Sequence, residues 1–266
     1  MSNILLKIAY DGSGFHGWQK QPGVRTVQGV LEEKLETVIG APVQIEGTSR
    51  TDAGVHALGQ QATLRGDFGI PTERVPVAVN NLLEDIRVIS AEEKPEGFHA
   101  RFDALGKTYV YRFAIAHSDE IFLRNYAYLL AKRPNIGNMS EAAEYIEGTH
   151  DFTCFKAAGG AEPESAVRTV FGFRVVAGTG TTPAGISYET IDVEVTGDGF
   201  LYNMVRIIAG TLLEAGFEKI GPKDIPGIIA SKDRALAGPT ARPQGLYLKE
   251  VYYDSGALAA RTRSKR

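Results

Sequence analysis

One arrangement occurs twice along this chain: an apolar strand, a turn that contains Asp-Gly, and an amphipathic helix. In the first copy, residues 4–10 are mostly apolar and are followed by Asp11 and Gly12, which are typical of the end of a strand. Thr26 is a favourable helix N-cap, and apolar residues then recur at helical spacing until Gly40 stops the helix. This stretch therefore predicts an α/β unit.

The second copy lies in the C-terminal part of the chain. Residues 186–195 alternate with the period of a strand, residues 197–200 (GDGF) form the turn, and residues 201–215 are expected to be helical. The repetition predicts two related α/β halves, residues 1–105 and 106–255, on either side of a central cleft where ligands usually bind. Further strands are expected at residues 43–46, 60–64, 87–90 and 107–115, and further helices at 75–83 and 140–148.

Composition narrows the class of protein. The single cysteine, Cys154, excludes an intramolecular disulfide and a cysteine-rich zinc site. No apolar run reaches the length of a membrane span, and the residues before Ile4 lack the basic segment of a secretion signal. A cytoplasmic protein is expected.

The charge balance alone argues against a nucleic-acid partner. The net charge is −3 and the isoelectric point is about 6.0, below that of a typical nucleic-acid binder. Residues 256–266 form a basic segment that is expected to be a flexible tail. Any phosphate-binding surface would have to be assembled by folding from basic residues in separate segments: Arg25, Arg50, Arg101, Lys107, Arg112, Arg168 and Arg206.

Two sequence features that could indicate a cofactor or a metal lack the surroundings that such a site requires. Residues 12–17 (GSGFHG) match the G-x-G-x-x-G pattern of dinucleotide sites, but the helix starts only near Val27 instead of directly after the turn. His16, His56 and His99 lie on separate segments without the spacing of metal ligands, so hydrogen bonds to backbone or phosphate explain them at least as well. No cofactor and no metal are expected.

The most distinctive stretch is residues 49–57 (SRTDAGVHA), which packs an arginine, a carboxylate and a histidine into a short turn between apolar runs. Asp52 is two residues from Arg50, and a nearby guanidinium favours the ionised form of a carboxylate. The small residues Ala53 and Gly54 allow a substrate to approach closely. The residues themselves leave two readings open: an activated carboxylate, or an Asx turn with an incidental surface ion pair.

Two apolar positions also allow two readings. Strand alternation places Tyr109, Tyr111 and Phe113 on one face of the strand at residues 107–115. Core packing explains an aromatic residue there, but Tyr109 could instead stack on a base. Leu246 could form a matching apolar wall or be buried in a strand.

Six motifs follow one another along the chain: residues 10–19 (YDGSGFHGWQ), 50–57 (RTDAGVHA), 98–102 (FHARF), 107–111 (KTYVY), 203–206 (NMVR) and 245–248 (GLYL). In this order they resemble the motifs of the tRNA pseudouridine synthase A family, and the resemblance extends from about Ile4 to Tyr253. Two residues depart from the family pattern: Ser49 stands where glycine is common, and Leu83 where proline is usual.

The resemblance implies an enzyme that isomerises uridines 38, 39 and 40 of the tRNA anticodon stem-loop to pseudouridine. It also implies a mixed α/β fold with a mostly antiparallel sheet, a homodimer, tRNA as the partner, and no cofactor or metal. A non-catalytic RNA-binding module and a dinucleotide-dependent oxidoreductase are the alternatives.

By the same resemblance, Asp52 is the catalytic carboxylate. Arg50 would keep Asp52 ionised and help fill the space that the flipped base leaves, while Tyr109 would stack on the uracil and could relay the C5 proton. Leu246 would close the pocket. Phosphate or pocket contacts are expected from Arg101 and Arg206, and a substrate contact from His56.

Overall fold

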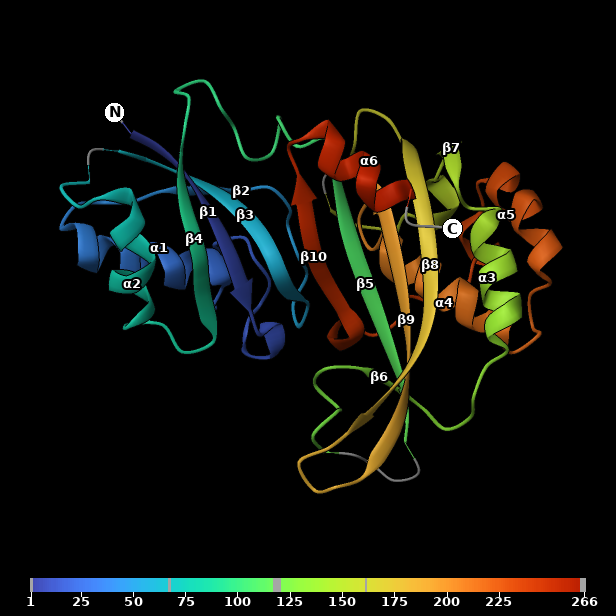
Figure 1. Ribbon diagram of the computed structural model, residues 1–266. Coiled ribbons are helices and arrows are strands. Elements are labelled where there is room, and N and C mark those ends of the chain that lie inside the picture. Colours follow the sequence, from blue (N-terminus) through green and yellow to red (C-terminus); the bar gives the residue numbers. More distant parts are fainter. Residues whose placement is uncertain (1, 67, 117–120, 161, 264–266) are drawn as a thin grey trace. The chain divides into compact units, whose positions relative to one another are not determined.

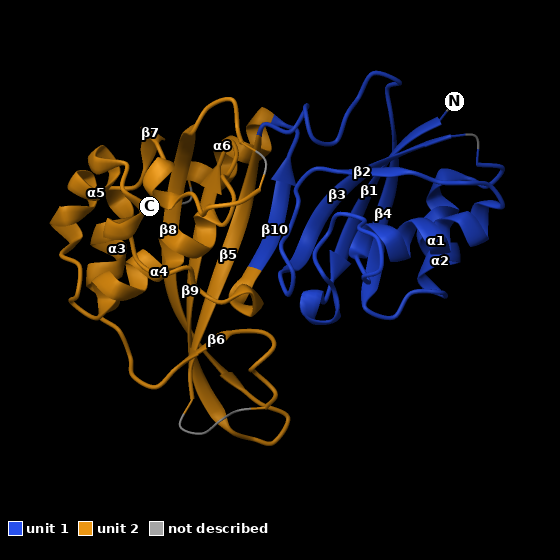
Figure 2. Cartoon of the chain, turned by 180° about the vertical axis from the view of Figure 1, so that it is seen from behind, with its two compact units in different colours: residues 1–105, 247–254 blue, residues 106–246, 255–266 orange. Residues whose placement is uncertain are grey.

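The computed structural model of this chain describes residues 2–66, 68–116, 121–160 and 162–263. Figure 2 colours its two compact units. Unit 1 comprises residues 1–105 and 247–254, and unit 2 comprises residues 106–246 and 255–266. The segment at residues 247–254, which the sequence assigns to the second half, thus belongs with the first.

Unit 1 contains a sheet with helices on one face (Figure 1). Strands β4, β1 and β3 are neighbours in that order and antiparallel, β2 pairs antiparallel with β3, and β10 pairs with β3 in parallel. The strands are β1 (Ser2–Tyr10), β2 (Ile45–Gly47), β3 (His56–Gly66), β4 (Ile86–Lys94) and β10 (Leu246–Tyr252), and the helices are α1 (Val27–Ile39) and α2 (Val75–Asn80).

The first predicted strand and helix are confirmed together with their end signals. The Thr26 hydroxyl accepts a hydrogen bond from the Gly29 amide, and Gly40 ends α1 in the left-handed conformation at φ 77°. Helix α2 is shorter than predicted and ends at Asn80. The Asn80 side chain exchanges two hydrogen bonds of 2.8 Å with the Val88 main chain, so it fixes the end of α2 to strand β4.

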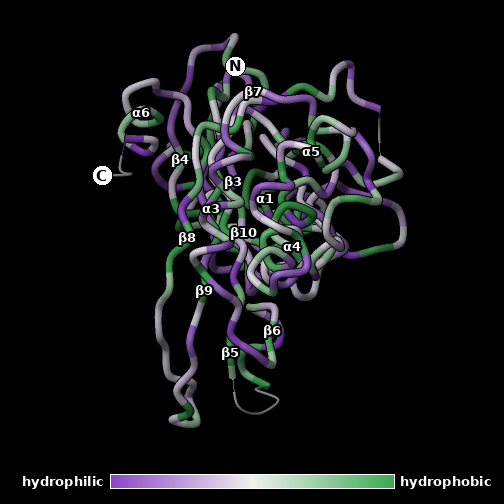
Figure 3. The backbone as a smooth tube through the Cα atoms, turned by 90° about the vertical axis from the view of Figure 1, so that its right-hand side faces the viewer, coloured by the Kyte–Doolittle hydropathy of each residue, from purple (hydrophilic) through white to green (hydrophobic). Residues whose placement is uncertain are grey.

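Unit 2 is built on four consecutive antiparallel neighbours, β5, β9, β8 and β7, with β6 parallel to β5. The hairpin of β8 and β9 extends beyond the helices of this unit (Figure 3), and α6 lies on the opposite face of the sheet from α4. The strands are β5 (Gly106–Ile115), β6 (Tyr128–Leu130), β7 (Gly148–Asp151), β8 (Val167–Thr181) and β9 (Ser187–Gly197), and the helices are α3 (Ile136–Glu144), α4 (Met204–Gly216), α5 (Ile225–Ser231) and α6 (Ser255–Arg263).

The second strand–turn–helix copy is also present, as β9 followed by α4, and it supplies the core of unit 2. Every residue of α4 except Arg206 and Glu214 is buried. The helix begins later than predicted because Asn203 adopts the left-handed conformation at φ 58°, which a helix cannot include. The predicted mixed α/β fold with a mostly antiparallel sheet is confirmed.

Two sequence predictions need correction. Helix α3 spans Ile136–Glu144, four residues before the expected start, because the Asn135 side chain accepts a hydrogen bond from the Asn138 amide and caps the helix there. Ser255–Arg263 form helix α6, where a flexible tail was expected, and Arg261 pairs with Glu194 on β9. The last three residues of that tail lie outside the described residues. Within the described ranges, no helix has the length and apolar character needed to cross a membrane.

Candidate active site

The Asp52 loop, residues 48–55, connects β2 to β3 in unit 1. Its turn is closed by a 3.1 Å hydrogen bond from the Val55 amide to the Asp52 carbonyl, and Gly54 adopts φ 77°. Asp52 itself is partly buried, whereas the neighbouring Ala53 is exposed. Asp52 is therefore neither fully desolvated nor fully exposed.

A neighbouring segment holds this loop through main-chain hydrogen bonds. The Trp18 amide donates to the Thr51 carbonyl at 3.0 Å, and the Gly54 amide donates to the Phe15 carbonyl at 3.3 Å. In addition, the hydroxyls of Tyr10 and Thr51 lie 2.7 Å apart. Residues on both sides of Asp52 are therefore fixed to one segment.

That segment is in turn fixed to helix α1. The Gln28 amide donates to the Trp18 carbonyl at 3.0 Å, and the Gln28 side chain accepts from the Lys20 amide at 3.0 Å. Glu32, only 3% exposed, accepts from the Ile45 amide and pairs with the Lys20 ammonium at 2.9 Å. A continuous network thus joins the Asp52 loop, α1 and the start of β2.

The glycines that match the dinucleotide-binding pattern lie where two backbone segments approach each other closely. A Cβ on Gly17, whose φ is 87°, would lie 2.6 Å from the Thr51 carbonyl oxygen. A Cβ on Gly12 would overlap the Val55 carbonyl. These glycines therefore allow two backbone segments to pack together at the Asp52 loop.

Gln60 anchors the start of the loop, and its side chain is completely buried. Its amide nitrogen donates to the Ser49 carbonyl at 2.7 Å, while its oxygen accepts from the Ser49 amide at 3.3 Å. Sequence analysis missed this residue, as it missed Tyr10 and Trp18. A polar side chain at an inward position of β3 was the available signal for Gln60, because a buried amide needs specific partners.

His56 begins β3 and is 2% exposed. Its Nδ1 lies 3.0 Å from the Gly12 amide nitrogen and 3.3 Å from an Asp11 carboxylate oxygen, and its ring stacks on Tyr247 at 4.7 Å. This burial makes His56 a support for the turn at Gly12.

The two arginines predicted in unit 1 are both exposed. Among the residues that the structure describes, neither Arg50 nor Arg101 forms an ion pair. Arg50 lies on the Asp52 loop, and Arg101 lies on the segment after β4, where its amide donates to His99 Nδ1 at 3.0 Å. Both guanidinium groups are therefore available to an anionic partner.

The remaining predicted residues belong to unit 2. Tyr109 on β5 is 7% exposed and packs edge-on against Phe200, with ring centroids 5.3 Å apart. Leu246, at the start of β10, is 6% exposed. Next to Tyr109 in the same strand, Tyr111 is fully buried and donates to the Arg242 carbonyl, and burial raises its pKa.

Arg206 lies in the first turn of α4. It donates through Nε to the Ala241 carbonyl at 2.8 Å and through Nη1 to the Asn203 side chain at 2.6 Å. The Ala241 amide donates back to the Arg206 carbonyl at 3.1 Å. Arg206 therefore joins the start of α4 to the segment that leads to Leu246.

The described side chains contain no group of three or more His, Cys, Asp or Glu residues that could hold a metal ion. The Asp52 loop carries a partly buried aspartate, Asp52, on a backbone fixed by hydrogen bonds, and the exposed Arg50 lies two residues before it. Such a carboxylate can act as a nucleophile or a base.

Comparison with known proteins identifies the family of this chain. The family model for tRNA pseudouridine synthase matches residues 7–103 and 142–254. The chain is 45% identical over 255 residues to tRNA pseudouridine synthase A of Bacillus subtilis (strain 168), covering 95% of this chain and 99% of that protein. It is 44% identical over 254 residues to the protein of the same name from Ruminiclostridium cellulolyticum, covering 95% of this chain and all of that protein.

These matches define an isomerase that acts on tRNA. The chain belongs to the tRNA pseudouridine synthase family.

Proposed function

We propose that this protein converts uridines 38, 39 and 40 in the anticodon stem-loop of tRNA to pseudouridine, with Asp52 as the catalytic carboxylate. The observation that carries the proposal is the Asp52 loop, in which Asp52 is partly buried and the residues on both sides of it are fixed by main-chain hydrogen bonds. Membership of the synthase family supplies the reaction class.

The reaction breaks the N1–C1′ glycosidic bond, rotates the uracil and joins C5 to C1′. The hydrogen on C5 then leaves as a proton, and N1 takes up a proton. The bonds broken and formed balance without an oxidant or a reductant. Asp52 acts on C1′ or C6 as a nucleophile, or as the base that opens a glycal route. In each case the carboxylate must start from a well-defined position, and the main-chain bonds of Thr51 and Gly54 fix the backbone that carries it.

Three other residues complete the proposal. Tyr109 stacks on the target uracil, because the face of an aromatic ring binds any base. Leu246 closes the pocket with an apolar surface. Arg50 favours the ionised form of Asp52 and enters the space left by the flipped base, for which its exposed guanidinium is suited.

Arg101 and Arg206 are proposed to contact phosphate or the pocket, and His56 to contribute to substrate binding through the turn that it supports.

A homodimer would explain how a chain of net charge −3 binds tRNA, since two copies can adjoin their positive faces. The tRNA affinity should then fall with salt. A monomer at micromolar concentration in ultracentrifugation would remove this explanation. A cytoplasmic location stays a prediction.

The decisive experiment is tritium release from tRNA that carries 5-tritiated uridine, because forming the C5–C1′ bond expels that hydrogen. Transcripts with uridine at only one of positions 38, 39 and 40 assign the target. Wild type should release tritium and Asp52→Asn should not, with tRNA binding retained in both. No release by the folded wild type from any transcript would refute the synthase and favour a non-catalytic RNA-binding module.

A further inference from the structure

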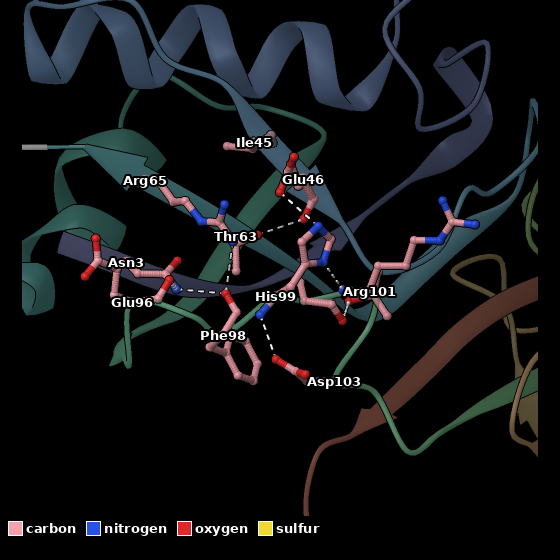
Figure 4. A network of polar contacts seen from close by, with 12 residues as sticks. Asn3, Ile45, Glu46, Thr63, Arg65, Glu96, Phe98, His99, Arg101 and Asp103 are labelled. Atoms are coloured by element: carbon pink, nitrogen blue, oxygen red, sulfur yellow. Dashed lines mark hydrogen bonds and ion pairs between the residues drawn. The ribbon is translucent and has the colours of Figure 1, made fainter. Parts of the chain in front are cut away.

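The segment at residues 95–103, which follows β4, is anchored at its start to the sheet of unit 1 (Figure 4). The Asn3 side chain donates to the carbonyls of Pro95 and Phe98, each at 2.8 Å, and Arg65 donates to the Phe98 carbonyl at 3.2 Å. Asn3 is only 4% exposed. The start of this segment is therefore rigid.

The same segment is fixed to the base of the Asp52 loop. The Ala100 carbonyl accepts hydrogen bonds from the Thr48 hydroxyl at 3.0 Å and from the Tyr253 hydroxyl at 2.7 Å. Thr48 precedes Arg50 by two residues in the chain. The residues directly after Ala100 are therefore held beside the loop that carries Asp52.

Arg101 and Phe102 come directly after Ala100 and are here called the Arg-Phe tip. Phe102 is 74% exposed, the highest value for a large hydrophobic side chain among the described residues. The Arg101 guanidinium lies 5.6 Å from the Phe102 ring centroid and extends away from the hydrogen-bonded network (Figure 4). The tip thus presents an aromatic ring and a cation to solvent.

The acidic residues around the tip are already engaged. Glu46 pairs with His99 Nε2 at 3.0 Å, and Asp103 accepts from the His99 amide at 2.7 Å. The His99 ring in turn lies 4.4 Å from that of Phe102. These contacts fix the side of the tip that faces the protein and leave the Arg101 charge without a carboxylate partner among the described residues.

A single exposed apolar residue is ordinary. A rigid exposed aromatic ring beside an available guanidinium is more specific, because it matches the two parts of an unpaired nucleotide: a base that stacks and a phosphate that carries negative charge. Building on the proposed function, we propose that the Arg-Phe tip binds an unpaired nucleotide of the tRNA substrate, with Phe102 stacked on the base and Arg101 on the phosphate.

Three variants of Phe102 test the stacking, measured as the Kd for full-length tRNA at fixed salt. Phe102→Ala should weaken binding by about tenfold, as expected for the loss of one stacked base, and Phe102→Leu should weaken it similarly because it keeps apolar area but not the aromatic face. Phe102→Trp should bind as wild type. Ile89→Ala, which shortens another exposed apolar side chain of unit 1 that is 50% exposed, is the matched control and should not change Kd.

Phe102→Trp also provides a direct signal. The one native tryptophan, Trp18, is 1% exposed, so the new indole would be the solvent-exposed emitter, and tRNA should quench it. Arg101→Gln should lower the slope of log K against log salt by about one, whereas Phe102→Ala should leave the slope unchanged.

Two results would overturn the proposal. One is a Kd for Phe102→Ala within twofold of wild type, with no quenching of Phe102→Trp. The other is a change of sedimentation coefficient in Phe102→Ala without tRNA, which would assign the ring to a contact between copies of the chain. Tritium release by wild type is measured on the same tRNA. If wild type releases no tritium but its tRNA binding depends on Phe102, the synthase activity is refuted and the proposed nucleotide binding by the Arg-Phe tip is still supported.

Discussion

The hydroxyl groups of Tyr10 and Thr51 lie 2.7 Å apart, and both side chains are buried. Tyr10 is the last residue of β1, whereas Thr51 immediately precedes Asp52. This hydrogen bond therefore links the end of the first strand directly to the neighbour of the proposed catalytic carboxylate. It is the side-chain complement of the main-chain bond between Trp18 and Thr51.

Removing that bond should slow the reaction more than it weakens binding. Tyr10→Phe keeps the ring but leaves the Thr51 hydroxyl without this partner, at a cost of about 1 kcal/mol in the free energy of unfolding. We expect kcat for tritium release to fall severalfold with little change in the Kd for tRNA. Tyr145→Phe, at an exposed tyrosine in unit 2, serves as the control and should change neither urea unfolding nor kcat.

The glycines at the loop offer a sharper comparison. Gly17→Ala should be strongly destabilising, because its Cβ would meet the Thr51 carbonyl and its φ of 87° is unfavourable for alanine. Gly23 has a similar φ of 76° but open space around its Cβ. Gly23→Ala thus measures the conformational cost alone. Equal losses of stability in thermal denaturation would contradict the close-approach explanation.

Some features of this structure can be predicted from the sequence and others cannot, as individual residues show. The predictions at Thr26 and Gly40 are confirmed, because helix caps are local signals that neighbouring residues decide. The sequence could not show the support of Asp52 by Tyr10, Trp18 and Gln60, because those contacts depend on which strands become neighbours.

The start of α4 shows the same limit. Only the left-handed conformation of Asn203 reveals that the helix begins at Met204. The roles of Asp52, Tyr109 and Leu246 came from motif resemblance and stay predictions until they are tested.

A pH effect is expected at an ion pair in unit 2. Asp151 lies 2.6 Å from the Lys232 ammonium, and the hydrogen bond from Lys232, helped by those from Thr153, lowers the pKa of Asp151 from 3.8 to about 2. A lowered pKa in the folded protein stabilises it above the unfolded pKa, and this contribution disappears as the pH falls from about 4 towards 2.

The variant Lys232→Gln should therefore be less stable than wild type at pH 6 by no more than about 1 kcal/mol, because Lys232 is largely exposed. The difference should narrow at pH 3. Chemical denaturation at both pH values measures it, and a difference that widens on acidification would contradict the assignment.

The single thiol should be unreactive in the folded protein. Cys154 is completely buried, and burial raises its pKa to about 11. Compared with its ordinary value of 9.0, that pKa alone reduces the thiolate fraction at neutral pH by about a hundredfold. An aromatic disulfide reagent should label Cys154 only after denaturation. Rapid labelling of the native protein would show that the segment around Cys154 opens.

The hydrogen bonds that hold the Asp52 loop to residues 15–18 have an evolutionary consequence. They join main-chain atoms, so no exchange of side chains other than a change to proline removes their donors or acceptors. Inserting or deleting a residue in either segment, however, shifts each amide away from its carbonyl. Apart from Gly17, where a Cβ would meet the Thr51 carbonyl, the two segments should thus tolerate drift in residue identity better than any change in length. A scan of single-residue insertions would map the site more sharply than a scan of substitutions.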